Sequence, residues 1–314
     1  MKITPKGLWK VLKDSFAGFS NDRIMKLSAA LAYYTVFSVG PLLIVVVFLC
    51  SFFFGREAIE GTIYGQIQGF VGHDAAVQLQ EIIKNAAIGG KGKVAAIIGI
   101  ITLVIGATSM FAEMQDSINM IWGLKAKPNS GWWPFVKNRL LSFGVIGSLG
   151  FLLLVSLSIS GIIEALSNRL KHHFPGIAVT LFYIINLVIN FGVIAALFAV
   201  IFRVLPDARI KWKDVMAGAI ATGILFMIGK FAISFYISKS NVGSTYGTAG
   251  SLVVLLVWIY YSSIILYFGA EFTKAYAMKY GSEIRPNEYT VIAKTIEVEQ
   301  GKKSVQEAEK ERKE

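Results

Sequence analysis

The chain has 314 residues, of which 54% are hydrophobic and 16% charged, and it carries a formal net charge of +11. Soluble domains contain about 25% charged residues, so this composition argues against a soluble protein. The chain has three histidines and one cysteine, namely His73, His172, His173 and Cys50. Their number and spacing exclude a zinc site built only from histidine and cysteine. The basic excess is better explained by membrane orientation than by nucleic-acid binding.

Residues 1–26 are predicted to form a cytoplasmic segment with one amphipathic helix, over 6–19. Leu8, Leu12 and Phe16 fall on one face of this helix, and lysines lie around the other side. Helices of this kind lie in the headgroup plane of a bilayer. We therefore expect the helix on the cytoplasmic membrane surface, with a partner-binding helix as the alternative.

Six long apolar runs follow within residues 27–282. Each is near or above the roughly 20 residues that a helix needs to cross about 30 Å of hydrocarbon. Lipid offers no partner for the backbone groups of an open strand, so the runs are expected to be helices. They are 27–54, 94–121, 140–163, 177–202, 215–237 and 251–270. The sequence predicts an all-α, polytopic integral membrane protein with about six transmembrane helices.

Lysine and arginine are divided unequally between the segments that connect these runs. The two ends of the chain and the loops after the second and fourth runs together hold 23, and the opposite side holds 7. Basic residues are enriched on the cytoplasmic side of membrane proteins. Both termini are therefore predicted to be cytoplasmic, which an even number of spans requires.

Two further segments lie outside the predicted membrane helices. The loop 55–93 is the longest on the external side, and its apolar spacing predicts two short amphipathic helices. The chain changes character after residue 283, and residues 297–314 carry five basic and six acidic side chains and almost no apolar ones. We expect residues 283–314 to be a charged, disordered cytoplasmic tail.

The second run ends in a group of polar side chains that includes Glu113, Asp116 and Asn119. Asp116 and Asn119 fall on one helical stripe. Polar groups at membrane depth are costly, so they usually face a bundle interior or a cavity. One interpretation is a pathway for a solute, proton or ion that Asp116 lines. The alternative is a helix end whose acids pair with Arg203 or Arg139.

The fourth and fifth runs carry polar side chains of their own. Asn186 and Asn190 lie one turn apart in the fourth run, and they suit either an interhelical hydrogen bond or a cavity wall. Lys230 lies in the fifth run, nearer its outer end. It is expected either to extend outward to the interface or to attract an anionic substrate.

The first and sixth runs contain backbone features that can shape a pocket. Pro41, following Tyr34 in the first run, is expected to kink the helix. Tyr246, Gly247 and Gly250 precede the sixth run. The helix that follows can point its N-terminus at an anion, and a tight turn is the alternative.

Glu271 closes the sixth run at its cytoplasmic end, where it can meet Arg203 or a lysine. These observations define a set of candidate residues for a substrate pathway. The set comprises Tyr34, Pro41, Glu113, Gln115, Asp116, Asn119, Asn186, Asn190, Arg203, Lys230, Tyr246, Gly247, Gly250 and Glu271.

Four groups of residues occur in a characteristic order along the chain. They are 29–35 with Ser38 and Pro41, 115–119 with Trp122, 203–206 with Trp212 and Gly218, and 246–250 with 258–260 and 269–271. Together they resemble the YihY / virulence factor BrkB family of bacterial inner-membrane proteins, from about residue 10 to 280. The resemblance implies a six-helix fold in the inner membrane.

The resemblance implies little chemistry. The family was at one time labelled a ribonuclease, and its members are otherwise described as transporters or as proteins that affect the cell envelope. A nuclease needs a metal-holding acidic cluster or a histidine acid–base pair in an accessible site. The nearby acids, Glu113 and Asp116, lie at membrane depth, so an RNA-cleaving enzyme is not expected.

We expect a non-enzymatic inner-membrane transporter or translocator. Its substrate would be a lipid or another amphipathic or anionic component of the envelope. The alternative is a membrane scaffold for envelope assembly that transports nothing. The expected partners are membrane lipids and unidentified envelope proteins, and not nucleic acid, while a homo-oligomer is left open. No cofactor and no metal are expected.

Overall fold

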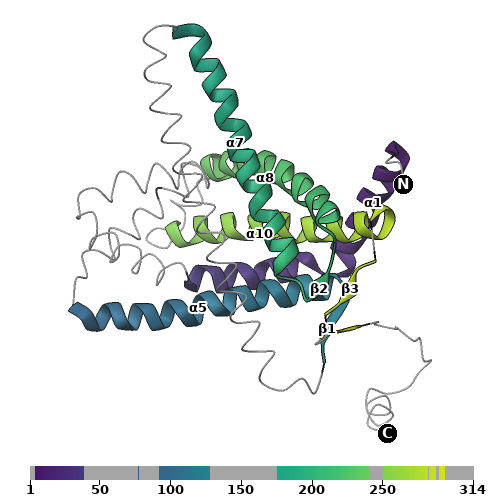
Figure 1. Cartoon of the computed structure of the whole chain (residues 1–314). Helices are drawn as coiled ribbons and strands as arrows, with labels where there is room; N and C mark the ends of the chain where they lie inside the picture. Colours follow the sequence, from purple (N-terminus) through teal and green to yellow (C-terminus); the bar gives the residue numbers. More distant parts are fainter. Residues whose placement is uncertain are drawn as a thin grey trace.

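The protein is described here from a computed structural model, shown in Figure 1. The structure describes residues 4–38, 77, 92–127, 175–240, 250–281, 283–287 and 290–293. These residues are mostly helical, as the hydropathy pattern predicts. The third predicted membrane helix and most of the external loop 55–93 lie outside the described residues.

Five labelled helices make up most of the described chain. They are α1 (Pro5–Asn21), α5 (Gly92–Ile121), α7 (Pro175–Val204), α8 (Trp212–Ser240) and α10 (Gly250–Tyr280), and a further helix covers 24–38. Within the described chain, three segments are long and apolar enough to cross a membrane, namely Ile184–Val204, Trp212–Ile237 and Leu252–Tyr280. They coincide with the last three predicted runs, and the full count of six stays a prediction.

The helices α8 and α10 pack against each other in opposite directions through small residues. A Cβ atom at Gly218 of α8 would collide with Thr273 of α10, and one at Gly269 of α10 would collide with Thr222 of α8. Glycine removes the side chain that would hold the two backbones apart. The α8–α10 pair therefore forms a close contact, and α7 also packs against α8.

The N-terminal helix α1 packs along the last turns of α10. Pro5 begins α1 after Thr4, whose hydroxyl accepts a hydrogen bond from Gly7 N, a usual way to start a helix. Val11 and Ser15 are buried in the contact, and the Phe16 ring lies 5.0 Å from that of Phe268. The face of α1 with Leu8, Trp9 and Phe16 stays largely exposed.

Because α1 covers its surface, α10 extends further than the hydropathy pattern indicates. The sixth run is predicted to end at residue 270, whereas α10 continues to Tyr280. Glu271 therefore lies within α10 and not at its end, and its place at the cytoplasmic end of the membrane span stays a prediction. It lies more than two turns before the end of α10, buried against α1. Hydropathy identifies the apolar residues of a helix. It does not show where a helix continues because another helix, here α1, packs against it.

Four short strands join the helix ends. The strands β1 (Leu124–Ala126) and β4 (Thr290–Ile292) pair antiparallel, as do β2 (Ala208–Arg209) and β3 (Arg285–Pro286). The described part of the predicted tail, residues 283–287 and 290–293, thus contains two of these strands. Residues 294–314 lie outside the described residues, so the disordered tail stays a prediction. Strands of two or three residues are too short to show a period of two in the sequence.

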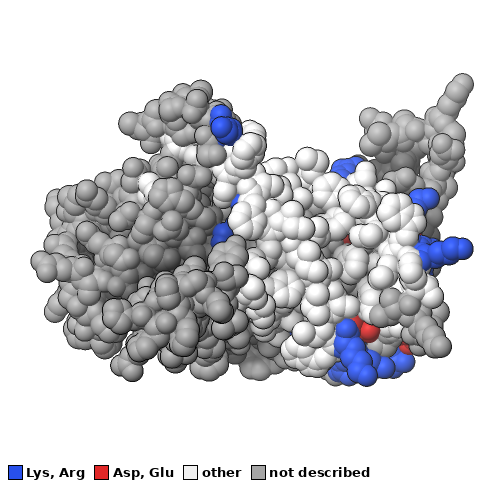
Figure 2. Space-filling view, turned by 90° about the horizontal axis from the view of Figure 1, so that it is seen from above, with Lys and Arg blue, Asp and Glu red and all other residues white. Residues whose placement is uncertain are grey.

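The ends of α5, α7 and α10 and the start of α8 meet at the strands (Figure 1). All these ends belong to the side that the distribution of lysine and arginine predicts to be cytoplasmic. Figure 2 shows much of the visible Lys and Arg at this end, with a largely uncharged surface along the helices. The arrangement is consistent with a membrane around the uncharged zone.

Candidate functional site

The acidic residues of α5 face a buried tyrosine of α10. Tyr267 is fully buried, and its hydroxyl lies near Glu113, Asp116 and Ser117. The Ser117 hydroxyl donates to Glu113 Oε1 at 3.5 Å. The Tyr267 hydroxyl forms no hydrogen bond with the part of the chain that the structure describes. We call Glu113, Asp116, Ser117 and Tyr267 the acidic row.

Arg203 does not neutralise the acidic row. Its guanidinium donates to the carbonyl of Ile210 and lies 5.7 Å from the centre of the Trp212 ring. Neither Glu113 nor Asp116 forms an ion pair within the described ranges. The alternative in which these acids pair with Arg203 is therefore not seen, and pairing with Arg139 stays a prediction because Arg139 lies outside the described residues. Asp116 is exposed and Glu113 is half-buried.

Asn119 is buried and joins α5 to the turn after α7. Its Nδ2 donates to Asp207 Oδ2 at 2.9 Å, and its Oδ1 accepts from Asp207 N at 2.9 Å. Two reciprocal bonds use both ends of the amide. Asn119 thus shares a stripe with Asp116, as the spacing predicts, but its side chain holds two elements together.

The polar side chains of α7 and α8 do not join the acidic row. Asn186 is exposed and Asn190 half-buried, and the first half of α7 projects away from α8 and α10 (Figure 1). Lys230 is half-buried in α8 and has an interaction of its own. The polar groups of the separate spans therefore do not converge on one point among the residues that the structure describes.

The remaining candidate residues for a substrate pathway lie at separate positions or outside the described residues. Tyr34 is part of an aromatic group with Tyr33, and its carbonyl accepts the Ser38 hydroxyl at 2.8 Å. Gln115 is half-buried on α5, and Gly250 begins α10. The candidates that lie outside the described residues are Pro41, Tyr246 and Gly247.

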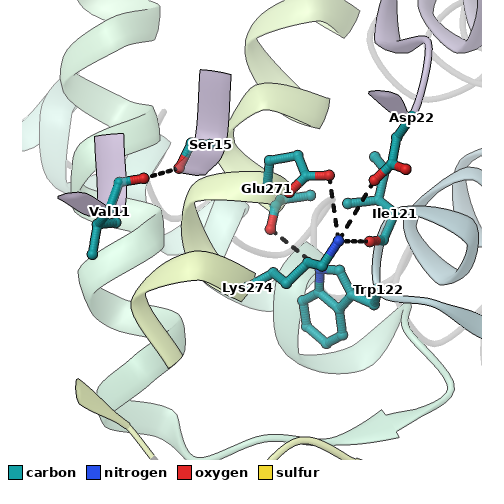
Figure 3. A network of polar contacts seen from close by, with 8 residues as sticks. Val11, Ser15, Asp22, Ile121, Trp122, Glu271 and Lys274 are labelled. Atoms are coloured by element: carbon teal, nitrogen blue, oxygen red, sulfur yellow. Dashed lines mark hydrogen bonds and ion pairs between the residues drawn. The ribbon is translucent and has the colours of Figure 1, made fainter. Parts of the chain in front are cut away.

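Glu271 meets a lysine, as one of the two alternatives predicts. Lys274 Nζ lies 3.6 Å from Glu271 Oε1 and 3.5 Å from Asp22 Oδ2, and it donates to the carbonyl of Ile121 (Figure 3). Trp122 Nε1 donates to the carbonyl of Ala270 at 3.2 Å beside this group. A single ammonium therefore connects α1, α5 and α10.

A cavity of about 630 Å³ lies between α1 and α10, next to this group. Lysines and acids from both helices line it, including Lys10, Asp14, Glu271 and Lys279. Sequence patterns do not reveal this cavity, because Lys10 and Asp14 look like the solvated face of a helix. Tyr267 and Lys274 are missed for similar reasons, since one looks like core and the other like a flanking charge.

The described residues contain no group of three or more His, Cys, Asp and Glu that could hold a metal ion. The site is therefore described by its acids, its lysines and its cavity.

Comparisons with known proteins identify the family. The model of the Virulence factor BrkB family matches residues 15–290. A "UPF0761 membrane protein" of Methylibium petroleiphilum is 26% identical over 262 residues, which cover 82% of this chain and 60% of that protein. Another, from Pseudoalteromonas atlantica, is 25% identical over 268 residues and covers 85% of each chain. No solved structure matches.

One relative has a different kind of name. The "Putative ribonuclease-like protein YfkH" of Bacillus subtilis is 26% identical over 265 residues, covering 83% of this chain and 92% of that protein. The chain thus spans 60% of the Methylibium relative and most of the other two. Since the family model covers most of the sequence and the described helices are long and apolar, this chain is a membrane protein of the Virulence factor BrkB family.

Proposed function

We propose that this protein is a translocator in the bacterial inner membrane, and that it moves a lipid or another amphipathic, anionic component of the envelope. The acidic row is the single observation that carries the proposal. Glu113 and Asp116 stand in a long apolar helix, against buried Tyr267, without an ion pair in the described part of the chain.

The cost of such acids supports a functional role. Glu113 and Asp116 lie in the last turns of α5, and an acid in a membrane helix costs about 2.5–3.5 kcal/mol at the centre and less toward the end. A structural ion pair would offset part of this cost, and the described contacts do not supply one. Acids that remain at membrane depth usually line a pathway for a substrate, an ion or a proton.

Reconstituted liposomes test the proposal. Purified protein should move a fluorescent phospholipid or a small anion between the two sides, as measured by quenching or by release. Asp116→Asn keeps the shape of the side chain and removes its charge. The rate should fall at least about tenfold, which corresponds to about 1.4 kcal/mol on the barrier. Glu283→Gln is the matched control, because Glu283 is an exposed acid after α10.

Liposomes with correctly folded protein that move neither lipid nor anion in either direction would show that the proposal is wrong. The same holds if Asp116→Asn transports as fast as Glu283→Gln. In that case the acidic row would be a packing feature.

A non-transporting scaffold is the second candidate. The observation that favours it is the position of the described cavity, which lies between α1 and α10 and not beside Asp116. The short strands and the exposed face of α1 would then serve as contact surfaces. Crosslinking in intact cells should recover a partner in a fixed ratio, and the absence of one would count against this candidate.

We do not propose cleavage of RNA. The ribonuclease-like name belongs to the Bacillus relative. The acids of the acidic row lie in a helix that we place in the membrane, where an RNA strand cannot reach them. Purified protein that degrades RNA and loses this activity in Asp116→Asn would contradict this view.

A further inference from the structure

The cavity between α1 and α10 has walls of two charges. Lys10 and Asp14 reach it from α1, and Glu271 and Lys279 reach it from α10. Gly18 forms part of the wall, and a Cβ atom there would approach the Glu271 carboxyl oxygens to 2.5 and 2.7 Å. Glycine at this position thus lets the carboxyl group reach the cavity wall.

Glu271 is an unusual group to find in a cavity wall. The residue is only 2% exposed, and its Oε1 accepts no hydrogen bond from the described chain. The Lys274 ammonium lies 3.6 Å away and also serves Asp22 and Ile121. A buried carboxyl oxygen without a hydrogen-bond donor is unfavourable. A ligand with an N–H donor would remove this cost.

Other groups of the wall suit an anion. Lys10 is exposed on α1, and Lys279 uses one of its donors on the Gly7 carbonyl at 3.0 Å. An ammonium has three donors, so Lys279 keeps two. Two lysines that face one cavity form a favourable place for a phosphate group. Asp14 and Glu271 oppose them, which disfavours an anion alone.

The cavity lies on the side of α1 away from its exposed apolar face. Residues 10, 14, 17 and 21 of α1 line it, and helical spacing puts them on one face. The exposed apolar face with Leu8 and Phe16, which also includes half-buried Leu12, lies on nearly the opposite side of the same helix. If that face rests on the membrane, the cavity faces the cytoplasm.

We propose that this cavity binds a small phosphate monoester that carries an ammonium group. The phosphate lies between Lys10 and Lys279, and the ammonium lies between Asp14 and Glu271. A volume of about 630 Å³ falls in the usual range for small-molecule sites, about 300–1,000 Å³. The same chemistry occurs in a free metabolite and in an ethanolamine lipid headgroup, and the orientation of α1 favours the free solute.

Calorimetry on the full-length protein in detergent tests the site, with O-phosphoethanolamine as the probe. We expect it to bind at least about tenfold more tightly than inorganic phosphate or ethanolamine alone, a gain of about 1.4 kcal/mol. Nanodiscs with and without phosphatidylethanolamine distinguish the lipid source. Binding of the lipid headgroup but not of the free probe would overturn the proposal of a soluble ligand.

Variants of the cavity residues test which side chains bind the ammonium group and which bind the phosphate. Glu271→Gln and Asp14→Asn should lower affinity for O-phosphoethanolamine toward that for inorganic phosphate, and they should leave phosphate binding intact or stronger. Asp14 is exposed, so its variant keeps the test informative if Glu271→Gln fails to fold. Lys10→Met should weaken both ligands. Its control is Lys13→Met, one turn along α1 and outside the cavity wall.

The proposal is wrong if phosphate and O-phosphoethanolamine bind equally well, or if neither binding curve saturates. It is also wrong if Lys13→Met has the effect expected of Lys10→Met. This inference goes beyond the proposed translocation, because binding is measured without transport. A protein that binds the probe and moves no lipid would support the cavity site and contradict the translocator.

Discussion

The pair of Asn119 and Asp207 shows how one residue can serve a different purpose from the one its position suggests. Asn119 stands on the same stripe as Asp116, in the last turns of α5. The structure directs its amide to the turn after α7, where it makes two bonds of 2.9 Å. Only 7% of the residue is exposed, so water cannot replace these bonds easily.

Asn119→Ala is therefore expected to destabilise the protein. It removes two partly buried hydrogen bonds and leaves the Asp207 carboxylate with one donor fewer, at a cost of about 2–4 kcal/mol. Thermal or denaturant unfolding in detergent measures this effect. Met120→Ala is the control, because Met120 is the next residue and is 57% exposed. Equal stability of the two variants would contradict the role assigned to Asn119.

At the scale of elements, α8 and α10 carry matching small-residue pairs. Gly218 and Thr222 are four residues apart on α8, and Gly269 and Thr273 are four apart on α10. Each threonine hydroxyl donates to the carbonyl of its own glycine at 2.7 Å, which satisfies the hydroxyl within its own helix. Each glycine receives the threonine of the opposite helix, so the two pairs interlock.

Gly218→Ala should loosen this contact. The added Cβ would overlap Thr273 Oγ1, and overpacking of this kind costs about 1–3 kcal/mol. Gly192→Ala on α7 is the matched control, since a Cβ there meets nothing within 4 Å. Alanine should stabilise that helix by about 0.5–1 kcal/mol. Unfolding in detergent compares them, and a shift of the same sign in both variants would show that the α8–α10 contact tolerates the methyl group.

At the scale of the whole molecule, the helix ends and four strands gather at one end of the described chain (Figure 1). The strand pairs tie the connections after α5 and α7 to the segment after α10. The backbone groups at the edges of such short strands need water or protein as hydrogen-bond partners. The strands therefore suit a position outside the hydrocarbon. The gathered end is thus the natural candidate for the cytoplasmic side.

Single cysteines test this orientation in a Cys50→Ser background. The variants are Lys13→Cys, Lys211→Cys and Glu283→Cys, which change residues that are exposed at the gathered end. They should react with an impermeant maleimide only in inverted vesicles. A cysteine at Lys239, near the other end of α8, should react in intact spheroplasts. Labelling of Lys211 and Lys239 variants from the same side would contradict the predicted topology.

Much of this architecture follows from hydropathy alone. The runs 94–121, 177–202 and 215–237 correspond to α5, α7 and α8 within a few residues. Lipid requires long apolar helices, so membrane spans are visible one at a time in the sequence. The family resemblance, carried by spaced glycines, aromatics and polar residues, is likewise confirmed by the family model.

The partners of each polar group required the tertiary structure. The sequence indicates that Asp116, Asn119, Arg203 and Glu271 are unusual, but it does not reveal that Asn119 binds Asp207 or that Arg203 turns to Ile210. The extension of α10 beneath α1 and the two strand pairs also depend on contacts between distant segments. Transfer into lipid acts on each segment by itself, whereas hydrogen bonds and cavities depend on which segments meet.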